Sequence, residues 1–432
     1  MSAPTIGLLG VASLVVLIMI RVPVGVALGL VGFTGYVALE GTTKALFVFG
    51  GVPLELASAY SLSVLPLFTL MGAYATLAGL STDLFRAANS VFASTRGSLA
   101  MAAIGASAAF GAVCGSSVAT AATMGRISIP EMLKNGYAPG LAAGAVAAGG
   151  TLGILIPPSL ILMIYAIIAQ LSVIKLFLAA VVPGILLTLF YMATVFVWTR
   201  LAPKAAPAIP AGGLRETGRL LLRVWDVSTL FAVTFGGIWF GWFSPTEAAA
   251  VGAFGALLLG LWRRTLSRTA ILDGLGETAR ITANIVLIVV GSTIFSYFVV
   301  QTSIAQNLVG WIRGTSLSPT TVMVLLVIVY IFLGCFLEGI GMVLVTVPVF
   351  LPLVIANGFD PVWFGVLQVI VVEIGLIHPP IGMNLFVIRA QSPEISLRDM
   401  YGGVLPFLAA PLLLIVLLIL YPDLALWLSR AL

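Results

Sequence analysis

Small hydroxyl side chains in an apolar segment are the first groups of this sequence that could bind an ion or a small solute. Gly115, Ser116, Ser117 and Thr120 lie within six residues of one another. Hydroxyl and backbone oxygens can coordinate a hard cation such as Na⁺, and hydroxyls can also solvate a carboxylate. The alternative is that these hydroxyls bond to their own helix and only pack.

Two proline pairs interrupt apolar segments in a matching way, at 157–158 and at 379–380. Proline lacks an N–H and clashes with the preceding turn, so each pair predicts a helix broken near mid-membrane, or a kink that only shapes packing. Broken helices expose carbonyls, which suit Na⁺, and amides, which suit a carboxylate. The candidate residues are Thr151, Gly153, Pro157, Pro158 and Ser159 at the first break, and His378, Pro379, Pro380 and Asn384 at the second.

Two carboxyl groups fall within apolar segments, where they are functional candidates by default. Glu338 lies in a glycine-rich interruption between Gly334 and Gly341, and we expect it in an ion site or gate. Glu373 lies one turn before the second break. Two roles are equally open for it, one in an ion site and one as the partner of a polar group in a helix contact. His378, the only histidine, is expected to be buried and neutral, with proton coupling as the alternative.

Composition places these residues in a membrane protein. The chain of 432 residues is 61% hydrophobic and 8% charged, whereas soluble domains carry about 25% charged residues. The net charge of +5 is spread over short loops, so it gives no sign of nucleic-acid binding. The sequence contains no clustered metal-ligand spacing, phosphate loop or Ser/His/Asp arrangement. We therefore expect neither an enzyme nor ATP hydrolysis.

Apolar runs long enough to cross a bilayer, about 20 residues each, define the elements that must position the candidate residues. We expect spans near 5–20, 23–39, 62–80, 140–169, 173–199, 227–243, 245–262, 282–301, 361–389 and 402–421. Two further runs are expected to be hairpins that enter and leave on one side: 97–125, which is flanked by Arg96 and Arg126, and 319–356, which is 38 residues long with a glycine-rich interruption. Irregular backbone of this kind is tolerated at depth only when it is buried in protein or lines a cavity.

The distribution of basic residues supports the two hairpins. With the N-terminus outside, all of the 20 Lys and Arg residues except Lys44, Lys175, Arg313 and Arg430 fall inside, as the positive-inside rule requires. If either hairpin were a single span, this pattern would be lost. The basic, amphipathic segment 214–224 is expected to lie on the inner membrane surface.

The order of elements predicts an all-α polytopic protein built as an inverted repeat of two five-span halves, which is typical of secondary transporters. Each half contains a re-entrant hairpin and a Pro-Pro-broken helix. We expect scaffold helices in 1–61 and 227–281, and a cytoplasmic linker with the amphipathic helix in 200–226. The first-repeat transport elements occupy 62–199, with the hairpin at 97–125 and the broken helix at 140–169. The second-repeat elements and the final span occupy 282–432, with the hairpin at 319–356 and the broken helix at 361–389.

Motifs spread over nearly the whole chain resemble the large membrane subunit of the tripartite ATP-independent periplasmic (TRAP) transporters, the DctM-like family. The strongest stretch runs from Phe110 to Ser159 and includes Gly-Ser-Ser-x-Ala-Thr and Ile-Pro-Pro-Ser. The second half adds Ser-Pro-Thr-Glu at 244–247, Gly-Phe-Asp-Pro at 358–361 and Pro-Pro-Ile-Gly-Met-Asn at 379–384.

This resemblance implies an elevator-type transport domain and uptake driven by a Na⁺ gradient across the bacterial inner membrane. It also implies two partners, a small four-helix membrane subunit (Q-type) and a periplasmic substrate-binding protein (P-type). The solute would be a small carboxylate, such as a C4-dicarboxylate, a sialic acid, a keto acid or a sugar acid. Apart from Lys175 and Arg389, which lie at the ends of the predicted spans 173–199 and 361–389, no Lys or Arg lies within a predicted span. Carboxylate selection is therefore assigned to the soluble partner.

Two positions depart from the family pattern. His378 stands where the family often has Thr, and Glu338 where it often has Asp, so altered coupling is an open alternative. A stand-alone ion-coupled carboxylate carrier of a related inverted-repeat fold is the main competing hypothesis. An uncoupled channel-like protein is disfavoured by the paired breaks.

Overall fold

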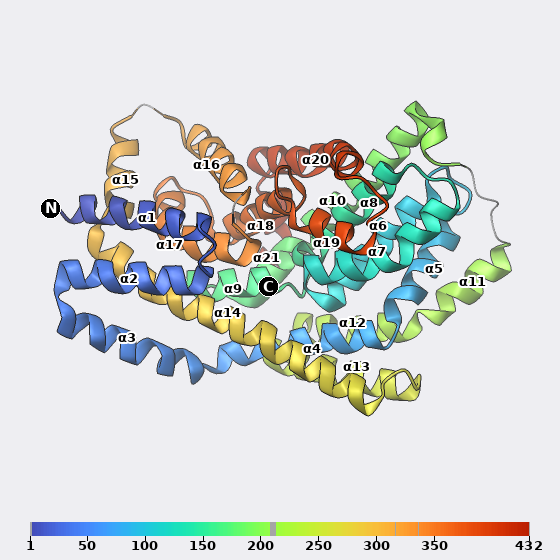
Figure 1. Cartoon of the computed structure of the whole chain (residues 1–432), viewed down its shortest axis with the longest axis horizontal. Coiled ribbons are helices and arrows are strands. Elements are labelled where there is room, and N and C mark those ends of the chain that lie inside the picture. The colour runs from blue at the N-terminus through green and yellow to red at the C-terminus, as the bar shows by residue number, and fades with distance from the viewer. Residues whose placement is uncertain (1, 208–212, 316, 336, 432) are drawn as a thin grey trace.

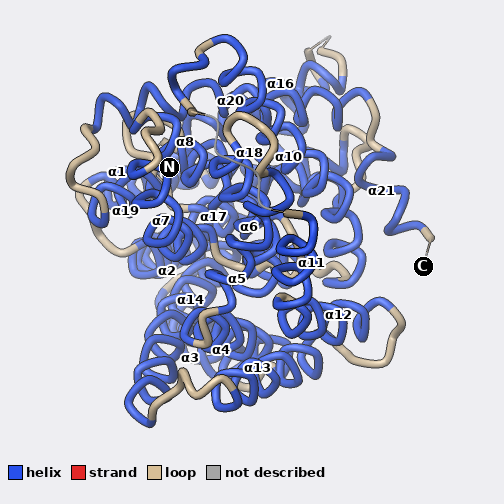
Figure 2. Tube along the Cα trace, turned by 90° about the vertical axis from the view of Figure 1, so that its right-hand side faces the viewer, coloured by secondary structure: helices blue, strands red, loops and turns tan. Residues whose placement is uncertain are grey.

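The computed structural model describes residues 2–207, 213–315, 317–335 and 337–431. Within these ranges the chain forms helices and loops and no strand, as Figures 1 and 2 show. The all-α prediction is thereby confirmed for the described residues. Part of the expected linker, 208–212, and Phe336 of the glycine-rich interruption lie outside them.

Five helices form a layer along one side of the molecule, visible in both views. They are α2 (Val24–Glu40), α3 (Thr42–Ala57), α4 (Val64–Leu77), α13 (Pro245–Trp262) and α14 (Arg268–Thr302). Within this layer α2 packs along α14, and α4 packs along α13.

Glycine allows α2 and α14 to pack backbone against backbone. A Cβ atom on Gly291 would lie 2.1 Å from the Gly25 carbonyl oxygen, and one on Gly32 would lie 2.7 Å from the Phe295 amide nitrogen. Such close approach through small residues is how helices associate in a membrane, where lipid gives no hydrophobic drive between them.

The first set of broken elements lies against this layer. Helices α6 (Ser98–Cys114) and α7 (Ser117–Lys134) form a hairpin pair, α8 (Pro139–Leu155) and α9 (Leu160–Ala169) form a broken helix, and α10 (Val173–Leu201) follows. The second arm of the hairpin continues beyond the expected end at 125 to Lys134. The segment after 125 is more polar than a membrane span, so a search for apolar runs stops too early.

The second set repeats the same order. Helices α16 (Pro319–Gly334) and α17 (Gly339–Ala356) form the hairpin pair, α18 (Pro361–Ile377) and α19 (Met383–Gln391) form the broken helix, and α20 (Leu397–Leu420) follows. Both proline pairs fall in the breaks, and both Pro–Pro peptide bonds are cis.

The remaining helices connect or flank these groups. The amphipathic segment expected at 214–224 is α11, as predicted. The other helices are α1 (Ala3–Met19), α5 (Leu80–Phe92), α11 (Leu214–Arg223), α12 (Trp225–Trp239), α15 (Ile304–Arg313) and α21 (Asp423–Arg430). Two short 3₁₀ turns cover Tyr60–Ser63 and Pro203–Ala205.

Fewer helices reach full spanning length than the ten spans expected from hydropathy. Within the described residues, six helices are long and apolar enough to cross a membrane, or up to eight if each bent pair counts as one span. The expected first two spans, α1 and α2, are each 17 residues long, which is at the lower end of the usual range.

Three helical regions were absent from the expected spans. Helix α3 lies within the expected scaffold range 1–61 but outside the expected spans, α5 turns away from α4 by 67°, and α14 begins at Arg268 rather than near 282. These segments carry charged residues on one face, and hydropathy alone does not separate such helices from loops.

An ion cluster fixes one end of the helical layer. Arg263, directly after α13, contacts Asp83 of α5 through Nη1–Oδ2 at 2.7 Å and Asp226 of α12 through Nε–Oδ2 at 2.9 Å. Asp226 is 1% exposed. A buried carboxylate needs such a partner, because its desolvation is costly.

We expect Arg263→Ala to lower the free energy of unfolding by about 3 kcal/mol or more, since it leaves Asp226 buried without its cation. Arg263→Lys keeps the charge but cannot reach both carboxylates with a planar fork. We expect it to lower the free energy of unfolding by less than Arg263→Ala does. The midpoint of thermal denaturation of the purified protein in detergent measures both. Equal midpoints for wild type and Arg263→Ala would contradict this assignment.

Candidate functional site

The two hairpins and the two breaks meet at one small cavity of about 90 Å³. Each of the four broken elements contributes to its wall. The lining residues are Gly115, Ser116, Ser117, Val118, Ile154, Leu160, Ile161, Glu338, Gly339, Ile340, Leu376 and Met383. Segments from both halves of the sequence therefore form a single site.

Four helices begin at this cavity. Ser117, Leu160, Gly339 and Met383 are the first residues of α7, α9, α17 and α19, and all four line it. The first turn of a helix has unpaired N–H groups and a partial positive charge. The cavity is thus suited to an anionic group although no Lys or Arg lines it.

The tip of the first hairpin packs closely on the first break. Gly115 ends α6 with a left-handed φ of +66°, and a Cβ atom there would lie 3.0 Å from the Pro158 carbonyl oxygen. The Leu160 amide donates to the Gly115 carbonyl at 3.5 Å. Ser116 caps α7 by accepting from the Ala119 amide at 3.4 Å. Glycine is needed at 115 for both the backbone angle and the close contact.

Ser117 joins the first hairpin to the second break rather than bonding to its own helix. The Asn384 amide nitrogen donates to Ser117 Oγ at 2.8 Å and to the Ala147 carbonyl of α8 at 3.1 Å. Both side chains are buried. One side chain of the second half therefore connects two elements of the first.

Thr120 and Gly153 lie on the other side of the hairpin tip. The Thr120 hydroxyl is buried and has no hydrogen-bond partner in the described part of the chain. A Cβ atom on Gly153 would lie 2.7 Å from that hydroxyl and 2.9 Å from the Ser116 carbonyl oxygen. Ser159 caps α9 by accepting from the Leu162 amide at 3.2 Å, and its hydroxyl donates to the Ile154 carbonyl.

The tip of the second hairpin presents a carboxylate to the cavity. Glu338 occupies the N-cap of α17 without forming a side-chain cap bond, and it is half-buried. Gly341 packs against Val24 of α2, with a Cβ-to-Cγ1 distance of 3.2 Å if it carried a side chain. The glycine-rich stretch therefore contacts both the cavity and the helical layer.

A matching glycine contact joins each hairpin to its break. A Cβ atom on Gly111 would lie 2.6 Å from the Gly153 Cα atom, and one on Gly375 would lie 2.8 Å from the Gly334 carbonyl oxygen. Gly153 and Gly375 each stand four residues before their proline pair. The same small-residue packing thus occurs at both breaks.

His378 differs from the buried, carbonyl-bonded histidine that was expected. It is half-buried, and Nδ1 lies 3.7 Å from the Cys335 thiol of the second hairpin. Pro379 and Pro380 are at least partly exposed, and the Pro380 carbonyl accepts from the Tyr401 hydroxyl at 2.6 Å. None of the three lines the small cavity.

Thr151 and Pro157 also lie away from the small cavity. The Thr151 hydroxyl donates to the Ala148 carbonyl at 2.8 Å and lies 3.2 Å from the Tyr191 hydroxyl. Pro157 lines a separate apolar cavity. Sequence spacing identified the break but could not give the direction of each side chain along it.

Glu373 is fully buried beside this hydroxyl pair. Its exposed fraction is 0%, and neither carboxyl oxygen has a hydrogen-bond partner among the described residues. Thr151 and Tyr191 are its polar neighbours. Glu373 is therefore neither an ion-pair partner nor part of the small cavity.

Several residues of the site carried no polar signal in the sequence. Leu160, Ile161, Ile340, Leu376 and Met383 form the apolar part of the wall. Tyr191, which pairs with Thr151, lies far along the chain on α10. Only the positions of Leu160 and Met383, which begin the helices after the two proline breaks, could have pointed to the site.

The fold is similar to that of a membrane transporter of known structure. The crystal structure of the Alcanivorax borkumensis YdaH transporter superposes with a TM-score of 0.61 at 16% identity, covering 89% of each chain. At this identity the likeness concerns the fold alone.

Sequence comparison then gives the family. The profile of the family described as "Tripartite ATP-independent periplasmic transporter, DctM component" matches residues 11–424. The C4-dicarboxylate TRAP transporter large permease protein DctM of Pseudomonas aeruginosa is 36% identical over 374 residues, covering 86% of this chain and 87% of the relative. The isethionate TRAP transporter permease protein DctMQ of Oleidesulfovibrio alaskensis is 31% identical, covering 93% of this chain and 62% of the relative. The chain belongs to the DctM family and is a multi-pass membrane transporter subunit, not an enzyme.

Alanine at the glycine contact of the first break should separate the hairpin from the break. We expect Gly153→Ala to lower the free energy of unfolding by about 1–3 kcal/mol, because its methyl group meets backbone that cannot move freely. Gly236→Ala is the matched control, since nothing lies within 4 Å of the added Cβ atom. Thermal denaturation in detergent compares them, and equal losses in both variants would contradict the close contact.

Glu373 should tolerate loss of its charge. A buried carboxylate without a partner is favoured in its neutral form. We therefore expect the free energy of unfolding of Glu373→Gln to lie within about 1 kcal/mol of the wild-type value. Glu373→Lys should fail to accumulate in the membrane. Membrane yield and thermal midpoint test this, and a Gln variant as unstable as the Lys variant would show that the site needs a charged carboxylate.

Proposed function

We propose that this chain is the permease of a Na⁺-driven importer that takes up a small organic acid delivered by a periplasmic binding protein. The observation that carries this proposal is the convergence of four helix N-termini, a carboxylate and three helix C-terminal ends on one cavity. Relatives named for C4-dicarboxylate and isethionate transport support a small organic anion as the solute.

The donors at the cavity suit Na⁺. Glu338 supplies a carboxylate without a capping bond, and the C-terminal ends of α6, α8 and α18 reach the cavity at Gly115, Ile154 and Leu376. The unpartnered Thr120 hydroxyl lies beside the hairpin tip. A Na⁺ ion here would supply positive charge between Glu338 and the carbonyl ends of these helices.

Coupling of ion and solute follows from charge. Glu338 would repel an anionic solute at the same helix N-termini, and a bound cation removes that repulsion. Binding of the cation therefore favours binding of the anionic solute, which is what a symporter requires. The carbonyl and amide ends provide both signs of partial charge without a buried arginine.

The size of the cavity requires a conformational change. A volume of about 90 Å³ corresponds to roughly three water molecules, which is too small for a dicarboxylate. The two hairpin-and-break sets pack through matching glycine contacts and support an inverted-repeat, elevator-type movement of both sets against the helical layer. We place the protein in a bacterial inner membrane, with its N-terminus on the periplasmic side.

Two partners complete the proposed importer. No Lys or Arg lines the cavity to pair with a carboxylate, so selection is assigned to the soluble binding protein. The relative named DctMQ is longer than this chain, and its name supports a small Q-type subunit as the membrane partner.

Reconstitution tests the proposal. The purified chain and its small subunit are placed in proteoliposomes, and uptake of the labelled organic acid is followed with and without binding protein and a Na⁺ gradient. We expect uptake only when both are present. Robust uptake without binding protein would favour a stand-alone carrier, and uptake that ignores Na⁺ but follows pH would overturn Na⁺ coupling.

Two substitutions at the cavity should uncouple transport. We expect Glu338→Gln and Ser117→Ala to reduce Na⁺-driven uptake at least about tenfold, the size of a lost charge-assisted contact, with membrane yield unchanged. Thr194→Ala is the control, because this hydroxyl bonds only to its own helix, at 2.9 Å from the Phe190 carbonyl. Wild-type uptake in both site variants would refute the site.

A further inference from the structure

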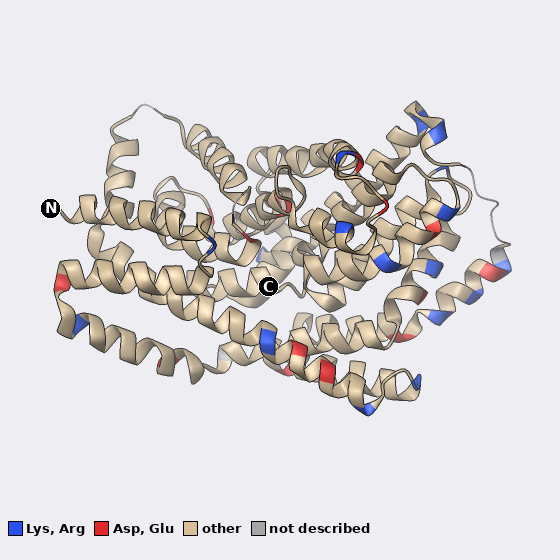
Figure 3. Ribbon diagram, in the orientation of Figure 1, with Lys and Arg blue, Asp and Glu red and all other residues tan. Residues whose placement is uncertain are grey.

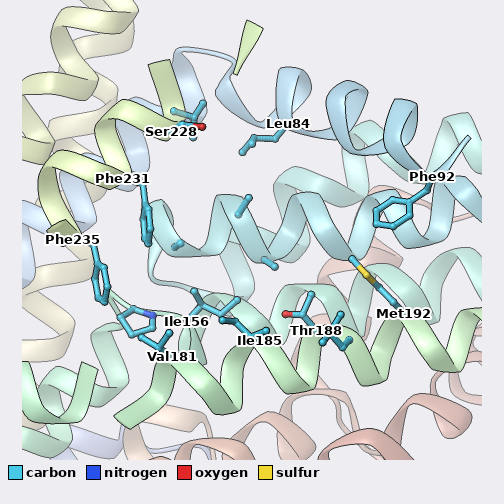
Figure 4. Close-up of a pocket in the computed structure, with 16 residues that line it drawn as sticks. Leu84, Phe92, Ile156, Val181, Ile185, Thr188, Met192, Ser228, Phe231 and Phe235 are labelled. Carbon is cyan, nitrogen blue, oxygen red and sulfur yellow. The ribbon is translucent and has the colours of Figure 1, made fainter. Parts of the chain in front are cut away.

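An apolar cavity of about 640 Å³ lies between the first break and helices α5, α6, α10 and α12. Figure 4 shows Phe231 and Phe235 at one end and Phe92 and Met192 at the other. The Thr188 hydroxyl in its wall already donates to the Gly184 carbonyl at 2.8 Å. The cavity therefore offers hydrocarbon contact and almost no polar recognition.

The cavity opens sideways along α10. Ile185 is 55% exposed and Leu189 is 53% exposed, and both belong to a helix that is long and apolar enough to span a membrane. An apolar space of this size, if empty, leaves its lining atoms without contacts. A hydrocarbon chain entering from the bilayer would restore them.

Basic residues lie close to one part of this cavity. Arg219 and Arg223 are exposed on α11, and no ion pair with an acidic residue is found for either in the described ranges. Val227 lines the cavity four residues after Arg223, beyond a bend of 46° between α11 and α12. Figure 3 shows the positive charges along α11.

Helix α11 is also held against a second wall of the cavity. The Thr217 hydroxyl donates to the Ser90 carbonyl of α5 at 3.5 Å, and α5 provides Leu84 and Phe92 to the lining. The arginines and the apolar cavity thus belong to one contiguous region.

We propose that this region binds one anionic phospholipid, with an acyl chain in the cavity and its phosphate on Arg219 and Arg223. A basic amphipathic helix at the start of an apolar span is suited to anionic headgroups. A transmembrane helix of the small subunit could also cover apolar walls, but it would leave the two arginines without a role.

The bound chain would contact the transport machinery. Ile156 and Pro157 of the first break form part of the cavity wall, while Ile154 and Leu160 on either side line the small cavity. The acyl chain lies between the break and α12, so it supports the break from the side opposite the ion site.

The test uses the purified complex with its small subunit in detergent. Dioleoyl phosphatidylglycerol and dioleoyl phosphatidylcholine, which share their chains and differ in charge, are titrated while bound lipid is counted by native mass spectrometry. Arg219→Gln/Arg223→Gln removes the headgroup site. Ala109→Phe fills the cavity from α6, and Ala193→Phe, the matched control, fills a separate groove between α10 and α20.

We expect wild type and Ala193→Phe to bind one phosphatidylglycerol at least about tenfold more tightly than phosphatidylcholine. The double arginine variant should lose that preference, and Ala109→Phe should lose the bound lipid. Equal affinity for both lipids in wild type, or unchanged binding in Ala109→Phe, would overturn the proposal. Crosslinking of the small subunit to a cysteine placed at Ile185 in the lipid-loaded complex would show that protein occupies the cavity instead.

Discussion

Broken backbone inside a membrane protein must be satisfied by protein rather than by lipid, and the rest of this structure depends on that constraint. Two hairpin tips and two Pro-Pro breaks expose helix ends at the same depth of the fold. They meet at one cavity, where four helices begin. Asn384 closes the arrangement by bonding to Ser117 and to the Ala147 carbonyl. The groups that would be costly in lipid are the groups that can hold an ion and an anion.

Small residues allow the hairpins and the breaks to meet at one cavity, and ion pairs stabilise the helices around them. Gly111 with Gly153, and Gly334 with Gly375, bring hairpin and break to backbone contact in both halves. Outside the site, Arg263 ties three helices together through two aspartates. Among the described residues that line the cavity, Glu338 is the single carboxylate, so the electrostatics of the site depend on this group and on the helix ends.

Sequence reasoning located the breaks and hairpin tips because proline and glycine act locally. It could not give the pairing of Ser117 with Asn384, which lie 267 residues apart, although both residues were candidates. It placed Thr151, Pro157 and His378 in the site by proximity along the chain, whereas their side chains lie elsewhere. Helix α5 was missed because an amphipathic segment resembles a loop when only hydropathy is considered, whereas α3 is largely apolar and was not counted among the spans. The direction of a side chain and its pairing with a residue far away in the sequence depend on tertiary packing.

The central claim is that the two halves share one site through Ser117 and Asn384. A double-mutant cycle with Ser117→Ala and Asn384→Ala, measured as thermal stability in detergent with Na⁺-driven uptake alongside, tests it most directly. We predict that the effects are less than additive, with a coupling energy of about 1 kcal/mol. Fully additive losses would contradict the claim, because they would mean that the two side chains act independently.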